Sequence, residues 1–206
     1  MLRVGVLVSG TGTNLQALLD AFAAPDAPAR IVLVGSNRAD APALTRAERA
    51  NVPTCIVDRA RVPRRAERQA GLLGALRAHQ VDLVVLAGYD EILLPAFVAA
   101  YPGRLVNTHP SLLPAFGGSM HAVEQALEHG VKVAGCSVHL VTDELDSGPI
   151  LLQGCVEVRE DDTAESLHAR IREQEHRLLP QAVAAFAEGR VRVEGRRARV
   201  VASVAT

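Results

Sequence analysis

Aromatic side chains are scarce in this chain of 206 residues, which has an aromatic content of 3% and no tryptophan. Proteins that bind single-stranded nucleic acids usually stack bases on aromatic side chains, so the composition argues against that class. An excess of charge is lacking too. The formal net charge is −1, so no overall basic field attracts a polyanion. We therefore expect no nucleic-acid partner.

Long apolar runs and cysteines are also sparse. No segment is apolar for the roughly 20 residues that span a bilayer, and the apolar start, Leu2–Val8, is short and lacks a small-residue cleavage site. The cysteines Cys55, Cys136 and Cys155 are odd in number and show no metal-ligand spacing, which is typical of free thiols in a reducing compartment. We expect a cytoplasmic protein that binds neither membrane nor metal.

The remaining composition is that of a globular domain, with 49% apolar and 22% charged residues. Short runs rich in Val, Ile and Leu alternate with segments of helical apolar spacing, which predicts a mainly parallel sheet with helices on both faces. The predicted strands are Leu2–Val8, Ile31–Gly35, Thr54–Val57, Leu83–Ala87 and Leu105–Val106. The predicted helices are Asn14–Ala24, Ala41–Ala50, Arg64–His79 and Pro95–Ala100.

The C-terminal half has a different pattern. Its predicted elements are the helices Ala122–His129 and Thr163–Ala187 and the longer strands Val131–Val141 and Ile150–Val158. The mixed character of these strands indicates an antiparallel edge or a mixed sheet. Asp162 or Thr163 can cap the long helix, and Gly189 can end it. Arg190–Val201 alternates Val with Arg, which favours a solvated edge hairpin over a basic patch.

A glycine-rich turn, Ser9–Gln16, follows the first predicted strand. It is not a dinucleotide fingerprint, because position 15 is Leu and no acidic residue ends the second predicted strand. It is not a Walker A loop either, because no Gly-Lys-Ser/Thr sequence follows. Its glycines, hydroxyls and amide suit a terminal phosphate at a helix start. A plain turn capped by Thr13 or Asn14 remains an equal alternative.

Asn107 and His109 close a predicted strand. They are two residues apart, so both side chains leave one face, and Pro110 keeps His109 extended. A later turn adds the carboxylate of Asp146. An amide and an imidazole on one face, with a carboxylate to hold the imidazole, can stabilise an oxyanion and move a proton.

Simpler interpretations exist for each of these residues. His109 could be structural, and Asp146 could organise its own turn through an Asx bond. Asp143 and Glu144 are expected to be solvated. His139 lies in a predicted strand, where core packing is favoured over an approach to the site.

Beyond these residues, the chain resembles the folate-dependent glycinamide ribonucleotide (phosphoribosylglycinamide) formyltransferases of purine biosynthesis along nearly its whole length. The shared motifs are Ser9–Gln16, Ser36–Asp40, Leu86–Tyr89, Asn107–Pro114, His121–Leu127, Val138–Pro149 and Gln174–His176. The resemblance implies a Rossmann-like formyltransferase fold in one domain, 1–206, whose parallel N-terminal half continues into a mixed central sheet. The N-terminal half would bind phosphate, and the C-terminal half would bind folate and carry the catalytic residues.

The resemblance also implies residue roles, with 10-formyltetrahydrofolate as co-substrate and no metal. The catalytic residues would be Asn107 and His109, which stabilise the oxyanion, and Asp146, which supports His109 and proton transfer. The substrate-binding residues would be Gly12, Thr13, Asn14, Arg172 and Glu175. The folate-binding residues would be Arg65, Asp90, Glu91, Ile92, Leu93, Asn107, Val141, Thr142, Asp143 and Glu144.

The chain departs from the family pattern at two places. The family commonly has Met-Arg before Ile-Leu, where this chain has Asp90-Glu91. After Leu-Leu-Pro the family usually continues Phe-Pro-Gly, whereas Phe116–Met120 lacks the proline. The first departure reverses a charge, and the second changes a loop.

Four other functions are compatible with parts of this sequence. Methionyl-tRNA formyltransferase carries a C-terminal RNA domain and formyltetrahydrofolate deformylase an N-terminal regulatory domain, and we expect neither here. A nucleotide-binding oxidoreductase fits the fold alone, but lacks the third glycine and the ribose acid. A non-catalytic binding module would leave Asn107, His109 and Asp146 unexplained. The expected partners are small-molecule substrates, in a monomer or homodimer.

Overall fold

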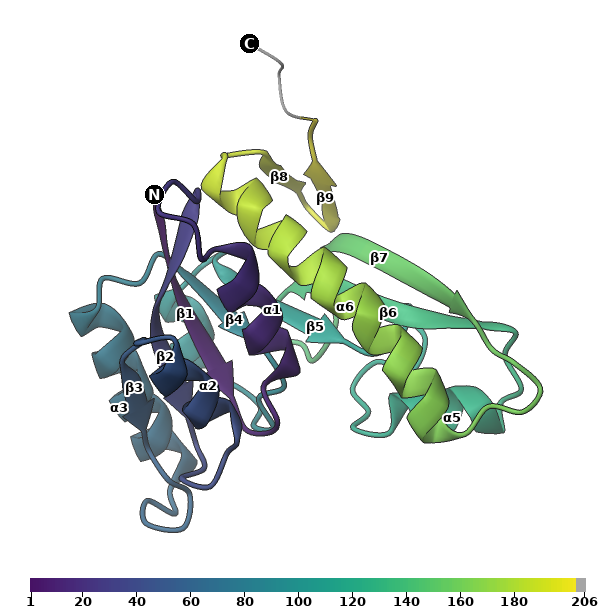
Figure 1. Cartoon of the computed structure of the whole chain (residues 1–206), viewed down its shortest axis with the longest axis horizontal. Coiled ribbons are helices and arrows are strands. Elements are labelled where there is room, and N and C mark those ends of the chain that lie inside the picture. Colours follow the sequence, from purple (N-terminus) through teal and green to yellow (C-terminus); the bar gives the residue numbers. More distant parts are fainter. Residues whose placement is uncertain (203–206) are drawn as a thin grey trace. The chain divides into compact units, whose positions relative to one another are not determined.

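A computed structural model describes residues 1–202. It divides into two compact units, Met1–Asn107 and a second that begins at Thr108 (Figure 1). Each unit consists of β-strands with helices packed on them, so the predicted α/β class is confirmed. No helix within residues 1–202 combines the length and the apolar character needed to cross a membrane.

The first unit is a parallel sheet in the order β3-β2-β1-β4-β5. Its strands are β1 (Leu2–Val8), β2 (Ala29–Ser36), β3 (Thr54–Ile56), β4 (Leu83–Leu86) and β5 (Leu105–His109), whose last two residues belong to the second unit. The central strands are apolar on both faces; Val6 and Leu7 of β1 are 0% exposed. Helices must therefore cover both faces of this sheet.

The helices of this unit are α1 (Thr13–Ala21), α2 (Ala43–Arg49), α3 (Arg65–Ala78) and α4 (Pro95–Ala100). Strand β2 lies on one side of β1 and β4 on the other, so right-handed crossovers put α1 and α2 on one face and α3 and α4 on the other. Ligands of open α/β sheets bind at the carboxyl ends of strands where the order reverses, here between β1 and β4. The segments that leave those ends are 9–12 and 88–94.

In the second unit β6 (Val133–Leu140) pairs antiparallel with β7 (Ile150–Glu157), which pairs parallel with β9 (Arg197–Val200). Strand β8 (Val191–Glu194) completes the predicted edge hairpin with β9. Helix α6 (Ala164–Ala187) packs along β6 and β7, and α5 (Ala122–Glu128) packs against α6 (Figure 1). The predicted parallel N-terminal half and mixed C-terminal half are both confirmed.

Candidate active site

The glycine-rich loop leaves the carboxyl end of β1 and leads into α1. Gly12 is the N-cap of this helix, with φ at 72°, and no side chain caps it. Thr13 and Asn14 therefore do not cap the helix, contrary to the plain-turn alternative. A Cβ atom on Gly12 would lie 2.5 Å from the Cβ of Ala43, so glycine is required here for conformation and for space. A helix that starts without a side-chain cap suits an anion at its N-terminus.

Arg46 of α2 supports this loop. Its Nε donates to the carbonyl oxygen of Thr11 at 2.9 Å, and its Nη1 donates to Oε1 of Gln16 at 3.1 Å. Nothing in the sequence marks Arg46 as part of this loop, because an arginine in a short helix gives no signal of a partner 35 residues away.

A closed set of hydrogen bonds joins the carboxyl ends of three strands. Ser9 Oγ donates to Asn37 Oδ1 at 2.7 Å, and Asn37 Nδ2 donates to Asp90 Oδ1 at 2.8 Å. The N–H of Asp90 donates back to Ser9 Oγ at 3.0 Å. Burial acts to raise the pKa of Asp90, but the hydrogen bonds from Asn37 and Ser9 and the nearby Arg59 lower it below its usual value. Asp90 is therefore a carboxylate at neutral pH.

The other residues assigned to folate lie on two segments and one helix end. After β4, Glu91 and Leu93 are half-buried, whereas Ile92 is 56% exposed. Arg65 is the exposed first residue of α3. After β6, Val141 is half-buried and Thr142 is exposed. Asp143 and Glu144 are also exposed, as expected.

In the second unit two histidines flank Asp146. Nδ1 of His109 lies 3.4 Å from Oδ2 of Asp146, and Nε2 of His139 lies 3.4 Å from Oδ1. The side chains of His109, Asp146 and His139 are 9%, 8% and 2% exposed. The predicted proximity of His109 and Asp146 agrees with this geometry. For His139, packing alone is an incomplete description, because this buried histidine also contacts the carboxylate.

The backbone and charge of Asp146 are unusual. Its φ of 49° lies in the left-handed region, which aspartate adopts more readily than most residues other than glycine. Its Oδ2 accepts the N–H of Gly118 at 2.8 Å, so the carboxylate contacts groups outside its own turn. Burial acts to raise the pKa of Asp146, but His139, the Gly118 N–H and His109 together lower it below its usual value. Asp146 is therefore a buried carboxylate.

The second ring nitrogen of each histidine also faces an acceptor. Nε2 of His109 lies 3.0 Å from the carbonyl oxygen of Phe116, and Nδ1 of His139 lies 2.9 Å from that of Leu140. Because a neutral imidazole has one N–H, only the doubly protonated ring donates at both positions. Each ring nitrogen of His109 thus faces an oxygen acceptor.

Asn107 and Thr108 precede His109 on β5. Asn107 is half-buried and is the register partner of Leu86 in β4. Thr108 points to the opposite face of the strand, where its hydroxyl donates to Oε1 of Glu175 at 3.3 Å. Glu175 is 4% exposed on α6, and Arg172, one turn earlier, is half-buried. Within residues 1–202, no cluster of His, Cys, Asp and Glu is arranged to hold a metal ion.

Comparison with known proteins places the chain in a family. The family model described as formyl transferase matches residues 2–183. The phosphoribosylglycinamide formyltransferase of Mycobacterium tuberculosis (strain H37Rv) is 50% identical over 95% of this chain and 90% of its own length. The human trifunctional purine biosynthetic protein adenosine-3 is 44% identical over 93% of this chain, which spans 19% of that protein.

Solved structures agree with this result. The glycinamide ribonucleotide transformylase 1 of Symbiobacterium toebii superposes with a TM-score of 0.94 at 52% identity, over 98% of this chain and 95% of that one. The fold is therefore shared with this transformylase over almost the full length of both chains.

Proposed function

Because the chain belongs to the formyl transferase family, we propose that it transfers the formyl group of 10-formyltetrahydrofolate to the amine of glycinamide ribonucleotide. The products are formylglycinamide ribonucleotide and tetrahydrofolate. The observation that carries the proposal is the buried pair of His109 and Asp146, in which His109 lies on the strand that also bears Asn107. This set supplies hydrogen-bond donors and a proton carrier, which formyl transfer to an amine requires.

The nucleophile is the amine of the substrate. An ordinary α-amino group has a pKa of about 8, so a usable fraction is uncharged near neutral pH. The amine attacks the formyl carbon and forms a C–N bond while the carbonyl oxygen becomes an oxyanion. The bond from carbon to the folate nitrogen then breaks, and that nitrogen takes the electron pair and a proton. No serine or cysteine nucleophile is needed.

Asn107 and His109 stabilise the oxyanion. Nδ1 of His109 is committed to Asp146, so Nε2 is the donor that must reach the oxyanion. Because this nitrogen now lies 3.0 Å from the carbonyl oxygen of Phe116, that carbonyl has to give way during the reaction. Asp146, or a water that it holds, carries the proton from the attacking amine to the leaving nitrogen.

The ligands are assigned to the ends of helices and strands. The substrate phosphate binds at the start of α1, on Gly12, Thr13 and Asn14, where the backbone N–H groups and the helix dipole favour an anion. Arg172 and Glu175 contact the substrate. Folate binds to the segments Asp90–Leu93 and Val141–Glu144. Arg65 and Asn107 also contact the folate.

Formyl transfer followed by folate absorbance tests this proposal. We expect tetrahydrofolate to form only when glycinamide ribonucleotide is present. Formate release without an acceptor would instead identify a deformylase, and transfer to charged initiator tRNA would identify an RNA-directed enzyme. Either result contradicts the proposal.

Asn14→Ala separates the two ligand sites. The phosphate assignment predicts a higher KM for the ribonucleotide and an unchanged affinity for folate. Equal weakening of both ligands would contradict the assignment.

A further inference from the structure

The departure Asp90-Glu91 has its own set of partners within the first unit. Arg59 Nη1 donates to Oδ2 of Asp90 at 3.1 Å. Arg68 of α3 donates to Oε2 of Glu91 from Nε at 3.0 Å and from Nη2 at 2.6 Å. Both acidic side chains of the segment are therefore neutralised by arginines that precede it in the chain.

Arg68 is itself held in place. Its Nη1 donates to the carbonyl oxygens of Val62 at 2.6 Å and Pro63 at 2.7 Å. The guanidinium thus binds the end of one loop on one side and Glu91 on the other. Such a planar, multiply bonded arginine has little freedom to move, and the same holds for the carboxylate that it contacts.

Gln69, the next residue of α3, holds the backbone of the same segment. Its Nε2 donates to Oε1 of Glu91 at 3.0 Å and to the carbonyl oxygen of Ile92 at 2.9 Å. Its Oε1 accepts the N–H of Leu94 at 2.8 Å. Arg68 and Gln69 together fix the Glu91 side chain and two main-chain groups beyond it.

These polar side chains are buried. Arg68 is 7% and Gln69 2% exposed, on the face of α3 that also buries Leu72 and Leu76. A buried ion pair often stabilises a fold no better than apolar side chains of similar volume. A gain in stability is therefore a weak explanation for this buried ion pair. The ion pair and its hydrogen bonds do fix the geometry of the segment that follows β4.

We propose that Arg68 and Gln69 are positioning residues of the folate site, which hold the segment Glu91–Leu94 in the conformation that binds folate. This inference rests on the proposed function, because that function assigns the segment to folate. Arg68 also balances the charge of Glu91, which would otherwise repel the carboxylates of the folate tail. Neither residue belongs to the folate-binding set expected from the sequence.

Arg68→Met and Gln69→Leu test the proposal. Each should raise the KM for 10-formyltetrahydrofolate about tenfold, equivalent to about 1.4 kcal/mol. The KM for glycinamide ribonucleotide should change less than about twofold. A binding measurement that needs no turnover, calorimetric titration with 5-formyltetrahydrofolate, should show the same tenfold weakening.

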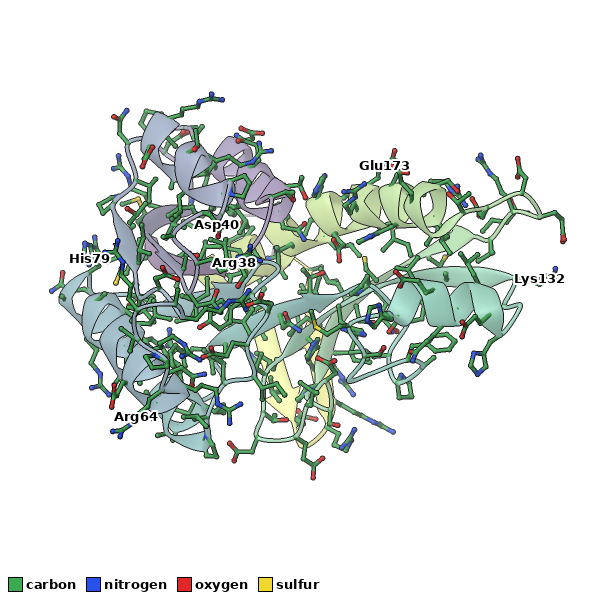
Figure 2. All side chains as sticks on the ribbon, turned by 90° about the horizontal axis from the view of Figure 1, so that it is seen from below. Arg38, Asp40, Arg64, His79, Lys132 and Glu173 are labelled. Carbon is green, nitrogen blue, oxygen red and sulfur yellow. The ribbon has the colours of Figure 1, made fainter. Side chains whose placement is uncertain are left out.

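Arg64→Met is the matched control. Arg64 immediately precedes α3 and pairs with Glu67 at 3.1 Å, but its side chain is 81% exposed and is directed away from the fold (Figure 2). Its loss removes one arginine charge close to Arg68 in sequence without touching the segment. Folate affinity should be unchanged in this variant.

The double variant Arg68→Met with Glu91→Met guards against misfolding. It removes both buried charges, so the chain should fold with a Tm near that of the wild type. Its folate affinity should remain weaker than that of the wild type, because the Arg68–Glu91 link is lost and only Gln69 still joins α3 to the segment. A folded double variant that binds 5-formyltetrahydrofolate like the wild type would overturn the positioning role. Wild-type protein that binds this folate but does not formylate glycinamide ribonucleotide would contradict only the proposed function.

Discussion

His109 and His139 share one carboxylate: each places a ring nitrogen 3.4 Å from a different oxygen of Asp146. The three side chains are nearly buried, so solvent screens their charges little. A change in any one of them alters the surroundings of the other two. The cluster should therefore act as a unit in catalysis.

Single substitutions of Asn107, His109 and Asp146 by Ala should each lower kcat by about 10²–10³. Substrate KM values should change much less, because these groups act mainly on the transition state. The double variant of His109 and Asp146 should be hardly slower than the slower single variant, since the two residues work together. Steady-state kinetics of the purified variants measures all of this.

His79→Gln is a suitable control for these variants. His79 is the C-cap residue of α3, and its Nδ1 lies 2.9 Å from the carbonyl oxygen of Ala75. Its loss should leave kcat unchanged. Near-normal turnover by a folded Asp146→Ala enzyme would contradict the proposed mechanism.

The stability of the chain should depend on Asp146 in acid. Because the pKa of this carboxyl is lowered in the folded chain, protonation favours unfolding. Its contribution is fully present above about pH 4, the ordinary aspartate pKa, and is lost as the pH falls through the lower folded value. The difference in unfolding free energy between wild type and Asp146→Asn should shrink over that range in urea titrations. A difference independent of pH would contradict this expectation.

Gly12→Ala should destabilise the fold by about 2 kcal/mol or more. The positive φ alone costs an alanine about 1–2 kcal/mol, and the new Cβ would lie 2.5 Å from that of Ala43. Gly10→Ala is the matched control in the same loop, because a Cβ there meets no atom within 4 Å. Thermal or urea unfolding compares the two, and equal losses of stability would show that space and φ do not matter here.

Cys136 should resist alkylation in the folded protein. It is 0% exposed, and burial, with the charge of Glu175, raises the pKa of its thiol to about 12. Cys155 is exposed and should react first with iodoacetamide near pH 8. An ordinary thiol has a pKa of about 8.5, so part of it is the reactive thiolate at that pH. Peptide mass mapping before and after denaturation measures this. Rapid modification of Cys136 in the folded chain would contradict the structure.

The fold was predictable because its core strands are continuous apolar runs. The errors lie where polar residues interrupt a run. The apolar pattern predicts the last strand of the first unit over Leu105–Val106, whereas β5 continues to His109. Asn107 pairs with Leu86 through main-chain groups, so its polar side chain does not end the strand. The alternation of strands and helices predicts the parallel pairing but not the strand order.

The candidate site was predictable only in part. Asn107, His109 and Asp146 carry a local signal, since two of them share a strand and the third lies on a glycine–proline turn. Arg68 and Gln69 carry none, because charged and amide residues near a helix start are usually solvated. Their burial results from contact with a segment more than twenty residues later in the chain.

The two hydrogen bonds from Gln69 to the segment after β4 engage main-chain atoms of Ile92 and Leu94. A main chain held from outside can keep its conformation with different side chains, so this segment can carry the acidic pair Asp90-Glu91. The same feature matters for inhibitor design. Under the proposed folate assignment, an antifolate that hydrogen-bonds the main chain of this segment should tolerate the change of side chains. One that requires a cationic side chain at position 91 would meet the carboxylate of Glu91 and bind less tightly.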